Sequence, residues 1–522
     1  MSDYAIQLGV FAGLTLLVAA LTWWRCRRAV SSNDQAKDYF LAGGTLAWPF
    51  IAGSMLLTNL SAEQIVGMNG AQVALVAWWE FGAIAGLLIL AHVLIPLYYR
   101  HGCTTTPELI ERRLGDPGLR AGVSLLFLVG YLFILLPVVL YTGALFMKSM
   151  FQPDWSVFHI SVGFAVAGLA YAWFGGLRAI AISDTYNGVL LLVFGGLLTV
   201  LALAAIDFDL SGIPAERLTL WGAPDSDIPW TTLLTGMVFI HVFYWGTNMV
   251  IAQRALAARS VREAQKGLYA AAFFKLLIPL IVVLPGIVAF KLYGDIGDSA
   301  YGRLVDDVLP PWLSGAFAAM IAGAVLSSYN SGLNSASALY AMDIHAKYVN
   351  RAADVKRVGQ WVAVLFTIGS LAMVPLYQNA RSIIALLQQL NGLYSMPVLA
   401  IFLTAVAMPW VNGVAGRVGL VFGALLYAVF TFVWSPLHYI HLMFVTLLST
   451  LAVILIVDRW LSKRSPRRSP RRSPPRARQR RPRRRRRAHR APPAMRPRTS
   501  PCCAPTPPAW PTRARTGSTR TR

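Results

Sequence analysis

Charged residues are scarce in this chain of 522 residues. Asp, Glu, Lys and Arg make up 13% of it, while hydrophobic residues make up 56%. A water-soluble domain of this size needs a larger share of charged side chains on its surface. The scarcity of charge therefore excludes an ordinary soluble protein and favours one that crosses a membrane several times.

Cysteine is also rare, and no catalytic pattern accompanies it. The four cysteines, Cys26, Cys103, Cys502 and Cys503, have neither the spacing of a zinc site nor that of a disulfide framework. The chain shows no pairing of a nucleophile with a base, and the glycines of FGGLR (174–178) follow no strand, so they are not a nucleotide fingerprint. We therefore expect no enzyme activity and no organic cofactor.

Acidic residues are missing from the end of the chain. Residues 463–522 hold 22 Lys and Arg and no Asp or Glu, so the net charge of +24 belongs mostly to this tail. Its Arg/Pro/Ser-rich composition predicts a disordered segment. Three interpretations are open: a polybasic segment on anionic lipid, an RNA-binding segment, and the product of a shifted reading frame. We favour the last and expect no nucleic-acid partner.

The rest of the chain contains long apolar runs. Each run is long enough to cross a hydrocarbon core about 30 Å thick. The predicted spans are 5–24, 46–70, 75–99, 120–148, 157–175, 182–205, 229–252, 267–291, 311–336, 357–376, 381–407, 415–434 and 438–459. The sequence therefore predicts an all-α polytopic membrane protein with about thirteen transmembrane helices.

Basic and acidic residues alternate between successive loops. The basic clusters are Arg25, Arg27, Arg28 and Lys37; Arg100, Arg112 and Arg113; Arg254, Arg259 and Lys266; and Lys347, Arg351, Lys356 and Arg357. Intervening loops, at 207–227 and 295–307, are acidic. Because basic loops stay in the cytoplasm, this pattern predicts an extracytoplasmic N-terminus.

Polar residues interrupt several predicted spans. They include the run TNLSAEQIVGM (58–68), Glu80, Lys275 and the cluster SSYNSGLNSAS (327–337). An ionisable group inside a span costs about 2.5–3.5 kcal/mol, so such groups usually face a cavity or a partner. Two structural alternatives are open: Ser331 and Ser335 could serve helix packing, and Glu80 and Lys275 could form an ion pair between helices.

Two of the interrupted spans stand at corresponding positions. The second span contains the polar run, and the seventh contains HVFYWGTNM (241–249), with five spans between their starts. Broken helices at matching positions of two five-helix halves are typical of an inverted-repeat transporter, because unwound backbone is tolerated where it lines a cavity. The polarity of the second span is therefore interpreted as that of a binding-site helix.

The polar groups suit two kinds of cargo. A hard cation such as sodium prefers carbonyl and hydroxyl oxygens, and Ser327 and Ser328 with an unwound second span supply them. A neutral polyol needs amides, paired charges and an aromatic face. Such groups are Asn59, Gln64, Glu80, Lys275 and Gln388, with Trp79, Tyr244 and Trp245 as the aromatic side chains. The absence of an unpaired Arg within the spans argues against an organic acid.

At these residues the chain resembles the sodium/solute symporter family, most closely its bacterial sodium/glucose (galactose) branch. The matching stretches include DYFLAG, TNLSAEQIVGM, FGGLRAIAISD, FYWGTN, QRALAARSVREAQKG, LPGIVAF, VLSSYNSGLNSAS and QQLNGLYSMP. The resemblance implies a LeuT-like fold of two inverted five-helix repeats and uptake of a sugar with sodium across a bacterial inner membrane. It implies sodium ligands at the carbonyls of Leu57, Leu60 and Ala324 and the hydroxyls of Ser327 and Ser328. It implies substrate contacts at Asn59, Ser61, Gln64, Glu80, His241, Tyr244, Trp245, Lys275 and Gln388, and a possible sodium exit or gate at Asp184. Tyr244 would be the inner gate.

The resemblance also implies an organisation along the chain. The expected parts are a peripheral first helix and cytoplasmic loop (1–45), a first repeat (46–205), an extracytoplasmic loop (206–228), a second repeat (229–407), two peripheral helices (408–462) and the tail (463–522). The chain departs from the branch at Trp79, Ala83 and His241, where the branch has Tyr, Ser and Asn, so its readout of hydroxyl groups differs.

We therefore predict sodium-coupled symport of a small neutral solute, a hexose such as glucose or galactose, in contact with membrane lipid. One alternative is a sodium symporter for a sialic acid, a polyol or an amino acid. Another, from a different class, is a membrane sensor or RNA-tethering protein whose effector is the basic tail. A sensor usually carries a folded signalling domain, and the sequence shows about sixty low-complexity residues in its place.

Overall fold

The computed structural model describes residues 3–27, 35–151, 154–378 and 383–464. These residues belong to one compact unit, Met1–Pro466. The predicted disordered tail falls, from residue 465 onward, outside the described residues. Within the described ranges every element is a helix, and an isolated parallel bridge joins Leu46 to Ala258.

The first predicted repeat consists of helices that match spans two to six. Its elements are α3 (Trp48–Asn59), α4 (Ala62–Ala71), α5 (Trp78–Ile89) with η3 (Leu90–Leu94) and α6 (Ile95–His101), α7 (Glu108–Leu114), α8 (Pro117–Gly130) with η4 (Tyr131–Leu135) and α9 (Leu136–Phe151), and α10 (Val157–Ala204). Short elements precede them: α2 (Gln35–Leu41), η1 (Ala42–Gly44) and, before α5, η2 (Ala74–Ala77).

The second predicted repeat follows a loop that holds α11 (Ala215–Leu218). Its elements are η5 (Trp230–Leu234), α12 (Gly236–Val242) with η6 (Phe243–Thr247) and α13 (Met249–Leu256), α14 (Val261–Lys275), α15 (Ile278–Val282), α16 (Leu284–Tyr293), η7 (Gly297–Ser299), α17 (Ala300–Val308), α18 (Pro311–Ala338) with η8 (Leu339–Val349), α19 (Val355–Met373) with η9 (Val374–Tyr377), and α20 (Ile383–Ala407). Three further helices, α1 (Asp3–Cys26), α21 (Gly413–Phe432) and α22 (Tyr439–Arg464), flank the two repeats.

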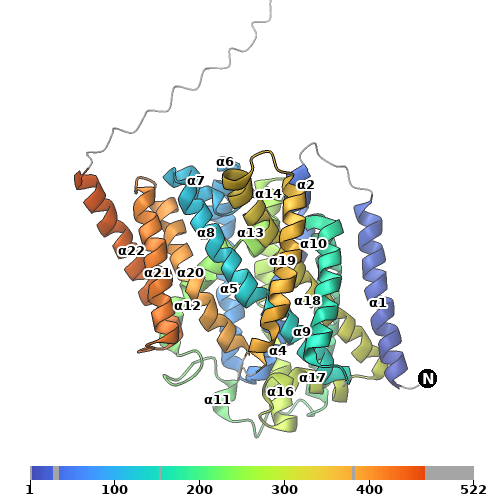
Figure 1. Cartoon of the computed structure of the whole chain (residues 1–522). Coiled ribbons are helices and arrows are strands. Elements are labelled where there is room, and N and C mark those ends of the chain that lie inside the picture. Colours follow the sequence, from blue (N-terminus) through green and yellow to red (C-terminus); the bar gives the residue numbers. More distant parts are fainter. Residues whose placement is uncertain (1–2, 28–34, 152–153, 379–382, 465–522) are drawn as a thin grey trace, which may run out of the picture. The chain divides into compact units, whose positions relative to one another are not determined.

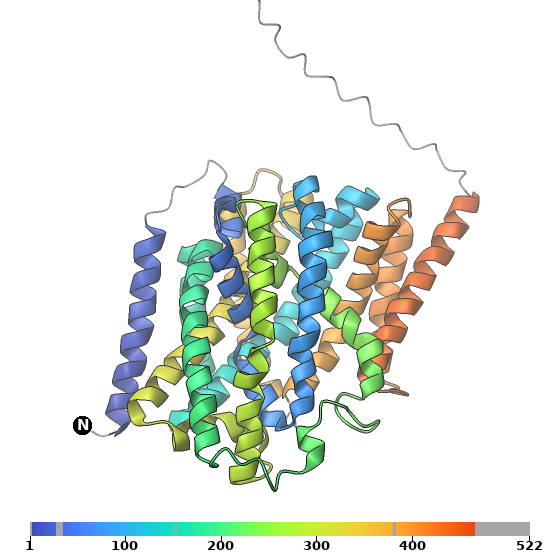
Figure 2. The ribbon, with the colours of Figure 1, turned by 180° about the vertical axis from the view of Figure 1, so that it is seen from behind.

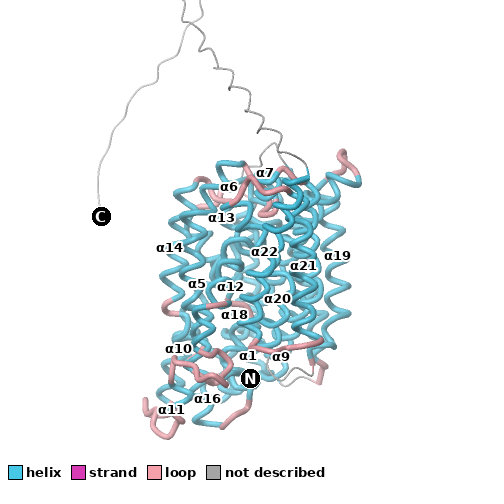
Figure 3. Tube along the Cα trace, turned by 90° about the vertical axis from the view of Figure 1, so that its left-hand side faces the viewer, coloured by secondary structure: helices cyan, strands magenta, loops and turns pink. Residues whose placement is uncertain are grey.

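The flanking helices lie at the edges of the bundle. Figure 1 shows α1 at one edge and α22 at the opposite edge, and the view from behind in Figure 2 agrees. Figure 3 places α6 and α7 at one end of the bundle and α11 and α16 at the other, near the start of α1. The basic residues of α7 and the acidic stretch around α11 therefore lie at opposite ends, as the alternation of loop charges predicts.

Nine helices of the described chain are long and apolar enough to cross a membrane, or ten if the bent pair Val261–Lys275 and Ile278–Tyr293 counts as one span. Each of the thirteen predicted spans nevertheless has helices at its place. The counts differ because two spans are broken into short helices and because α10 covers two predicted spans. At 48 residues α10 is roughly 72 Å long, more than twice the hydrocarbon thickness.

A glycine divides α10. Gly176 has φ +56° and ψ −170°, a conformation in which a side chain is strained, and a Cβ there would lie 2.8 Å from the carbonyl oxygen of Tyr39. The helix can therefore turn at this point only because residue 176 lacks a side chain. The two parts of α10 match the separate spans that the sequence predicts at 157–175 and 182–205.

Both predicted interruptions are present. Helix α3 ends at Asn59, Leu60 and Ser61 have non-helical backbone angles, and α4 starts at Ala62. The seventh span breaks at Asn248, whose φ of −66° and ψ of 124° are extended, directly after the π-helical turn η6. The predicted breaks of the second and seventh spans are thus confirmed, each within the sequence stretch that indicated it.

Candidate functional site

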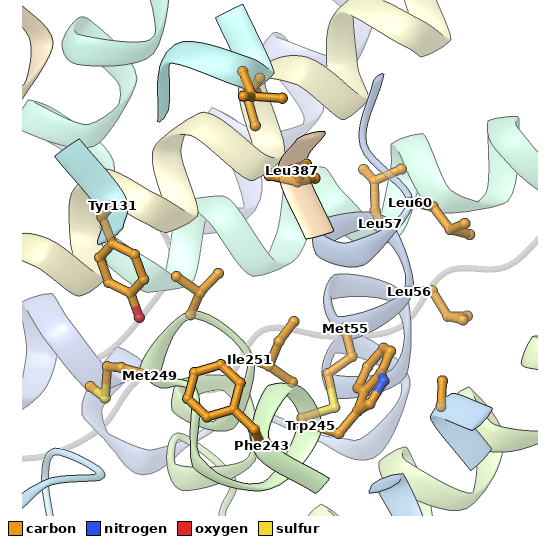
Figure 4. Packing of buried hydrophobic residues seen from close by; sticks show 14 of the residues in the cluster. Met55, Leu56, Leu57, Leu60, Tyr131, Phe243, Trp245, Met249, Ile251 and Leu387 are labelled. Atoms are coloured by element: carbon orange, nitrogen blue, oxygen red, sulfur yellow. The ribbon is translucent and has the colours of Figure 1, made fainter. Parts of the chain in front are cut away.

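The break between α3 and α4 exposes backbone oxygens in the interior of the bundle. The hydrogen bond from the Leu60 N–H to the Leu56 carbonyl closes the last turn of α3, and the chain then leaves helical geometry. Carbonyls of this last turn, including that of Leu57, therefore lack the backbone N–H that a continuous helix would supply four residues later. Figure 4 shows Leu56, Leu57 and Leu60 along this segment, with Met55 near Trp245 and Ile251. The break therefore offers carbonyl oxygens in an apolar surrounding.

Helix α18 brings two serine hydroxyls to this region. Ser328 Oγ donates to the carbonyl oxygen of Thr58 at 3.0 Å, and both residues are buried. Within the described part of the chain, Ser327 Oγ is buried and makes no hydrogen bond. A buried hydroxyl without a partner costs free energy, so it favours an additional group. These oxygens, with the buried Ala324 one turn earlier, fit the chemistry of a sodium ion.

Asp184 lies beside this region rather than in a solvated loop. The residue is part of α10 and 0% exposed. Ser54 Oγ of α3 donates to its Oδ2 at 2.5 Å. Its Oδ1 has no hydrogen-bond partner among the described residues, and Ser327 is a near neighbour. Asp184 therefore adds a carboxylate to the polar groups between α3, α10 and α18.

Arg254 is the buried cation of the same region. The sequence assigned it to a cytoplasmic basic loop, and this was wrong: the residue lies in α13 and is 0% exposed. Its guanidinium donates to Ser54 Oγ at 3.2 Å and, at shorter range, to the carbonyl of Val250 and to Ser331 Oγ. Helix α13 begins at the break and packs against α3, which carries Arg254 inward. The span interior therefore does hold an Arg, but one that is already hydrogen-bonded.

Ser331 and Ser335 join neighbouring helices, which is the packing role that the sequence left open for them. Ser335 Oγ donates to Gln253 Oε1 at 2.8 Å, and Ser331 contacts both Arg254 and, at 3.4 Å, Thr58. These hydrogen bonds join α18 to α13 and α3. Hydroxyl groups between membrane helices commonly serve in this way.

A small polar cavity lies next to the two breaks. Its lining residues are Asn59, Glu63, Gln64, Trp79, Leu135, Ile240, His241, Phe243, Tyr244, Trp245, Asn248, Val250, Leu387, Gln388, Asn391 and Tyr394. The set combines amides and a carboxyl group with aromatic rings, so polar groups and apolar faces meet in one site, as in small-molecule binding sites. It includes six of the residues that the sequence predicted for the substrate: Asn59, Gln64, His241, Tyr244, Trp245 and Gln388.

The cavity is closed in this structure. Its volume is about 40 Å³, which accommodates water molecules but lies far below the roughly 300–1,000 Å³ of sites that enclose organic ligands. Binding of an organic solute therefore requires that the surrounding helices move apart.

Glu80 and Lys275 form a buried ion pair behind the cavity. They are 1% and 0% exposed, and the Lys275 ammonium donates to Glu80 Oε2 and to Asn59 Oδ1. The same ammonium lies 5.1 Å from the ring centre of Trp245. The ion pair that the sequence left open as an alternative is thus present. Neither residue lines the cavity, but through Asn59 the pair orients an amide that does.

Ser61 is another predicted substrate residue outside the cavity lining. Its hydroxyl is buried without a hydrogen-bond partner among the described residues, and it precedes the first turn of α4. Conversely, Glu63, Asn248, Asn391 and Tyr394 line the cavity although none was predicted to bind substrate. Glu63 and Asn248 belong to stretches that the sequence singled out. Asn391 lies three residues beyond Gln388 on α20 and Tyr394 three residues beyond Asn391, so helical spacing from Gln388 could have identified Asn391 and, through it, Tyr394.

Two glycines let α5 approach the second break. A Cβ at Gly82 would lie 2.2 Å from the His241 ring, and one at Gly86 would lie 2.5 Å from the His241 carbonyl oxygen. The pair forms a GxxxG motif, which allows close packing of membrane helices. Because neither position carries a side chain, α5 comes close to the helix that carries His241. The ring centres of Trp79 and His241 are 6.0 Å apart. The wall of the cavity depends on this close approach.

The sequence profile of the Sodium:solute symporter family matches residues 39–423. The chain belongs to this family. An uncharacterized symporter of Escherichia coli (strain K12), YidK, is 36% identical over 480 residues, which cover 87% of this chain and 83% of that protein. The Sodium/glucose cotransporter of Vibrio parahaemolyticus is 30% identical over 489 residues, which cover 86% and 89% of the two chains. The symporter family thus accounts for most of the membrane part.

A solved structure supports the fold. A Na⁺-coupled sialic acid symporter, in a substrate-bound outward-open state, superposes with a TM-score of 0.73 over 88% of this chain and 98% of that one, at 19% identity. The fold is therefore the LeuT-like arrangement of inverted repeats that the sequence predicted. Members of the symporter family are transporters and not enzymes. The chain is accordingly a multi-pass, sodium-coupled membrane symporter.

Proposed function

We propose that this symporter carries a small neutral solute with several hydroxyl groups, a monosaccharide such as glucose or galactose, into the cell with sodium. The observation that carries the proposal is the position of the polar cavity. It touches both helix breaks, and the Ser328 hydroxyl reaches the carbonyl of Thr58 beside it. A cation bound there and a solute in the cavity would share the same unwound backbone.

For sodium we propose the carbonyls of Leu57, Leu60 and Ala324 with the hydroxyls of Ser327 and Ser328. The support is that Ser327 Oγ is buried without a partner in the described chain, and that the break frees nearby carbonyls. Asp184 is the proposed exit or gate for the ion. Its Oδ1 is also buried without a partner there, on the neighbouring α10.

For the solute we propose direct contacts with Asn59, Gln64, His241 and Gln388, stacking on Tyr244 and Trp245, and Ser61, Glu80 and Lys275 as ligands that open toward it when the cavity widens. A cyclic polyol offers hydroxyl groups to amides and an apolar face to aromatic rings. The described residues that line the cavity include Glu63 and no Lys or Arg. This charge balance disfavours a carboxylate such as a sialic acid.

Transport by alternating access follows from the two repeats, which we assign to residues 46–205 and 229–407. The closed cavity must open first toward one face of the membrane and then toward the other. One positive charge that moves inward through 100 mV releases about 2.3 kcal/mol. At about 1.4 kcal/mol per tenfold change, a neutral solute could be accumulated about forty- to fifty-fold. Sodium must therefore bind preferentially to the solute-ready state.

We place the N-terminus outside the cytoplasm and the protein in a bacterial inner membrane. The basic residues Arg100, Arg112 and Arg113 of α6 and α7 lie at the end of the bundle opposite to the acidic loop 207–227 that holds α11, which supports this orientation, since basic loops stay in the cytoplasm. Cysteine labelling is the measurement. A Cys introduced at Asp225 should react with an impermeant maleimide in intact cells, whereas one at Arg351 should react only after lysis. The reverse pattern would contradict the orientation.

Uptake into proteoliposomes tests the function. Labelled glucose, galactose, inositol, an amino acid and a sialic acid should each be offered with an inward sodium gradient and with potassium in its place. We expect accumulation of a neutral sugar only with sodium. Sodium-driven uptake of the amino acid or the sialic acid alone would refute a monosaccharide substrate while leaving sodium coupling intact.

A further inference from the structure

A second cavity of the described residues is larger than the polar one. It has a volume of about 820 Å³ and lies between α1, α9, α10 and α18. Its walls are mostly apolar and include Phe11 of α1, Phe164 and Ala167 of α10, and Ala322 and Leu326 of α18. We call it the α1 groove. It belongs neither to the polar cavity nor to the proposed sodium site.

Helix α1 contacts α18 closely near its N-terminal end. Gln7 Nε2 donates to Ser314 Oγ at 3.0 Å, and a Cβ at Gly315 would lie 2.3 Å from the Gln7 carbonyl oxygen. Farther along α1, Thr22 is buried again. Between these points small residues of α10 and α18 face α1, and a Cβ at Gly163 would meet nothing within 4 Å. A gap therefore runs along the N-terminal half of α1, over the face that carries Leu8, Phe11 and Thr15.

The length of the groove matches one leaflet of a bilayer. Residues from Tyr4 to Thr15 of α1 line it, and eleven helical steps rise roughly 16 Å. This is about half of a hydrocarbon core of about 30 Å. Since α1 is a membrane span of this symporter, the medium that surrounds the groove is lipid. A single acyl chain fits both its length and its apolar walls.

The mouth of the groove has the side chains of a membrane interface. Tyr4 and Trp155 stand there at 48% and 67% exposure, and such rings gather at the headgroup level. Asp154 and His159 also belong to the lining, and the His159 ring lies 2.6 Å from Ser156 Oγ. The Asp154 carboxylate attracts an ammonium and repels a headgroup with net negative charge.

We propose that the α1 groove binds one phospholipid with an ammonium headgroup, of the phosphatidylethanolamine type. One of its two acyl chains lies along α1 against Ala167, Ala322 and Leu326, and its ammonium lies near Asp154. The lipid fills a gap that no described side chain fills. Membrane lipid is thus a resident ligand of a defined site rather than only a solvent.

The position of the groove links the lipid to sodium binding, and this step rests on the proposed function. At 100° per residue, Ala322 and Leu326 lie on the side of α18 opposite to Ala324 and Ser328. A lipid in the groove therefore supports the back of the helix that carries the proposed sodium ligands. Phosphatidylethanolamine should lower the sodium concentration needed for half-maximal uptake.

Native mass spectrometry of the full chain in detergent tests the lipid site without transport. Gly163→Phe should fill the groove. Gly196→Phe is the matched control, because it is the same change on the same helix and its Cβ also meets nothing within 4 Å. Wild type and Gly196→Phe should retain one added phosphatidylethanolamine, and Gly163→Phe should bind it at least about tenfold more weakly. Equal retention by all three proteins would overturn the site.

Two further measurements separate the remaining parts of the proposal. Phosphatidylglycerol should bind the wild type more weakly than phosphatidylethanolamine, and Asp154→Asn should reduce that preference; equal binding of both lipids would overturn the headgroup assignment. If Gly163→Phe fails to fold, the Asp154→Asn comparison still decides. Loss of lipid retention without any change in sodium dependence would overturn only the link to transport. Failure of sugar uptake with lipid retention intact would overturn only the proposed function.

Discussion

Ser328 on α18 donates its hydroxyl to the backbone carbonyl of Thr58, at 3.0 Å, where α3 ends. The contact joins the continuous helix of one repeat to the broken helix of the other. A serine hydroxyl that donates its proton still offers lone pairs to a cation. A sodium ion at this point would therefore hold the two repeats in one relative position, which is what coupling requires.

Replacing the serines should weaken sodium binding. We expect Ser327→Ala or Ser328→Ala to raise the sodium concentration for half-maximal uptake by about tenfold or more, because an oxygen that binds a charged group contributes about 1.5–3 kcal/mol. Substrate affinity should fall by the same coupling factor, since linkage is reciprocal. Ser337→Ala is the control on the same helix α18, because its hydroxyl donates to the Gly359 carbonyl of α19 instead. Unchanged sodium dependence in both serine variants would contradict the assignment.

Removing one member of the Glu80–Lys275 pair should destabilise the fold. Lys275→Met leaves a buried carboxylate unpaired, and such losses cost about 3–5 kcal/mol. Thermal unfolding in detergent should show a lower Tm. The double variant Glu80→Gln/Lys275→Met should regain most of the stability.

The same variants separate structure from transport. If Glu80 and Lys275 also contact the solute, the double variant should fold well and still lose most of its sodium-driven uptake. Normal uptake by a stable double variant would show that the pair is structural only.

Asp343 holds the end of α18 and η8 to α8. Its carboxylate accepts from Arg120 Nε at 2.8 Å, from Ser124 Oγ at 2.6 Å and from Thr105 Oγ1 at 2.9 Å, and it is buried. Asp343→Asn should cost about 3–5 kcal/mol of stability and lower Tm. Asp307→Asn, which weakens the exposed pair with Arg303, should cost less than about 1 kcal/mol. Similar losses in both variants would contradict this ranking.

Asp298, in the loop element η7, makes stability depend on pH. Burial raises its pKa to about 6, although the Ile383 N–H donates to it at 3.3 Å. Since this value lies above the usual pKa of about 3.9, the folded state binds the proton more tightly, and stability falls as pH rises from about 4 to about 6. Asp298→Asn does not titrate and keeps an acceptor. Its Tm should exceed that of wild type at pH 7.5, with the advantage gone near pH 4.

Asp209 is a control, because its pKa is shifted in the opposite direction to that of Asp298. Hydrogen bonds from Ser211 and the Lys291 ammonium lower its pKa to about 2, so its contribution is complete above about pH 4 and is lost only below it. The Tm difference between Asp209→Asn and wild type should therefore stay constant from pH 5 to pH 7.5. A Tm advantage of Asp298→Asn that does not change over that range would contradict the assignment to Asp298.

Local sequence was sufficient to predict the broken helices. The run from Thr58 to Gln64 places more polarity in a span than lipid tolerates, so the chain must use it in a cavity. The same argument identified Asn59, Gln64 and Gln388, which the structure places in one cavity wall. The fold class followed for the same reason, because apolar runs of membrane length leave a chain with few arrangements.

Helix packing decided which residues far apart in the sequence contact one another. Lys275 meets Glu80 across 195 positions, and a periodic pattern shows which face a residue occupies but not which residue lies opposite. Arg254 illustrates the same limit: it stands five residues before Arg259 of a basic loop, and only the position of α13 against α3 takes it out of water. Burial of a charge depends on elements that close around it from elsewhere in the chain. Composition therefore determined that this protein lies in a membrane, whereas helix packing determined which of its polar groups contact one another.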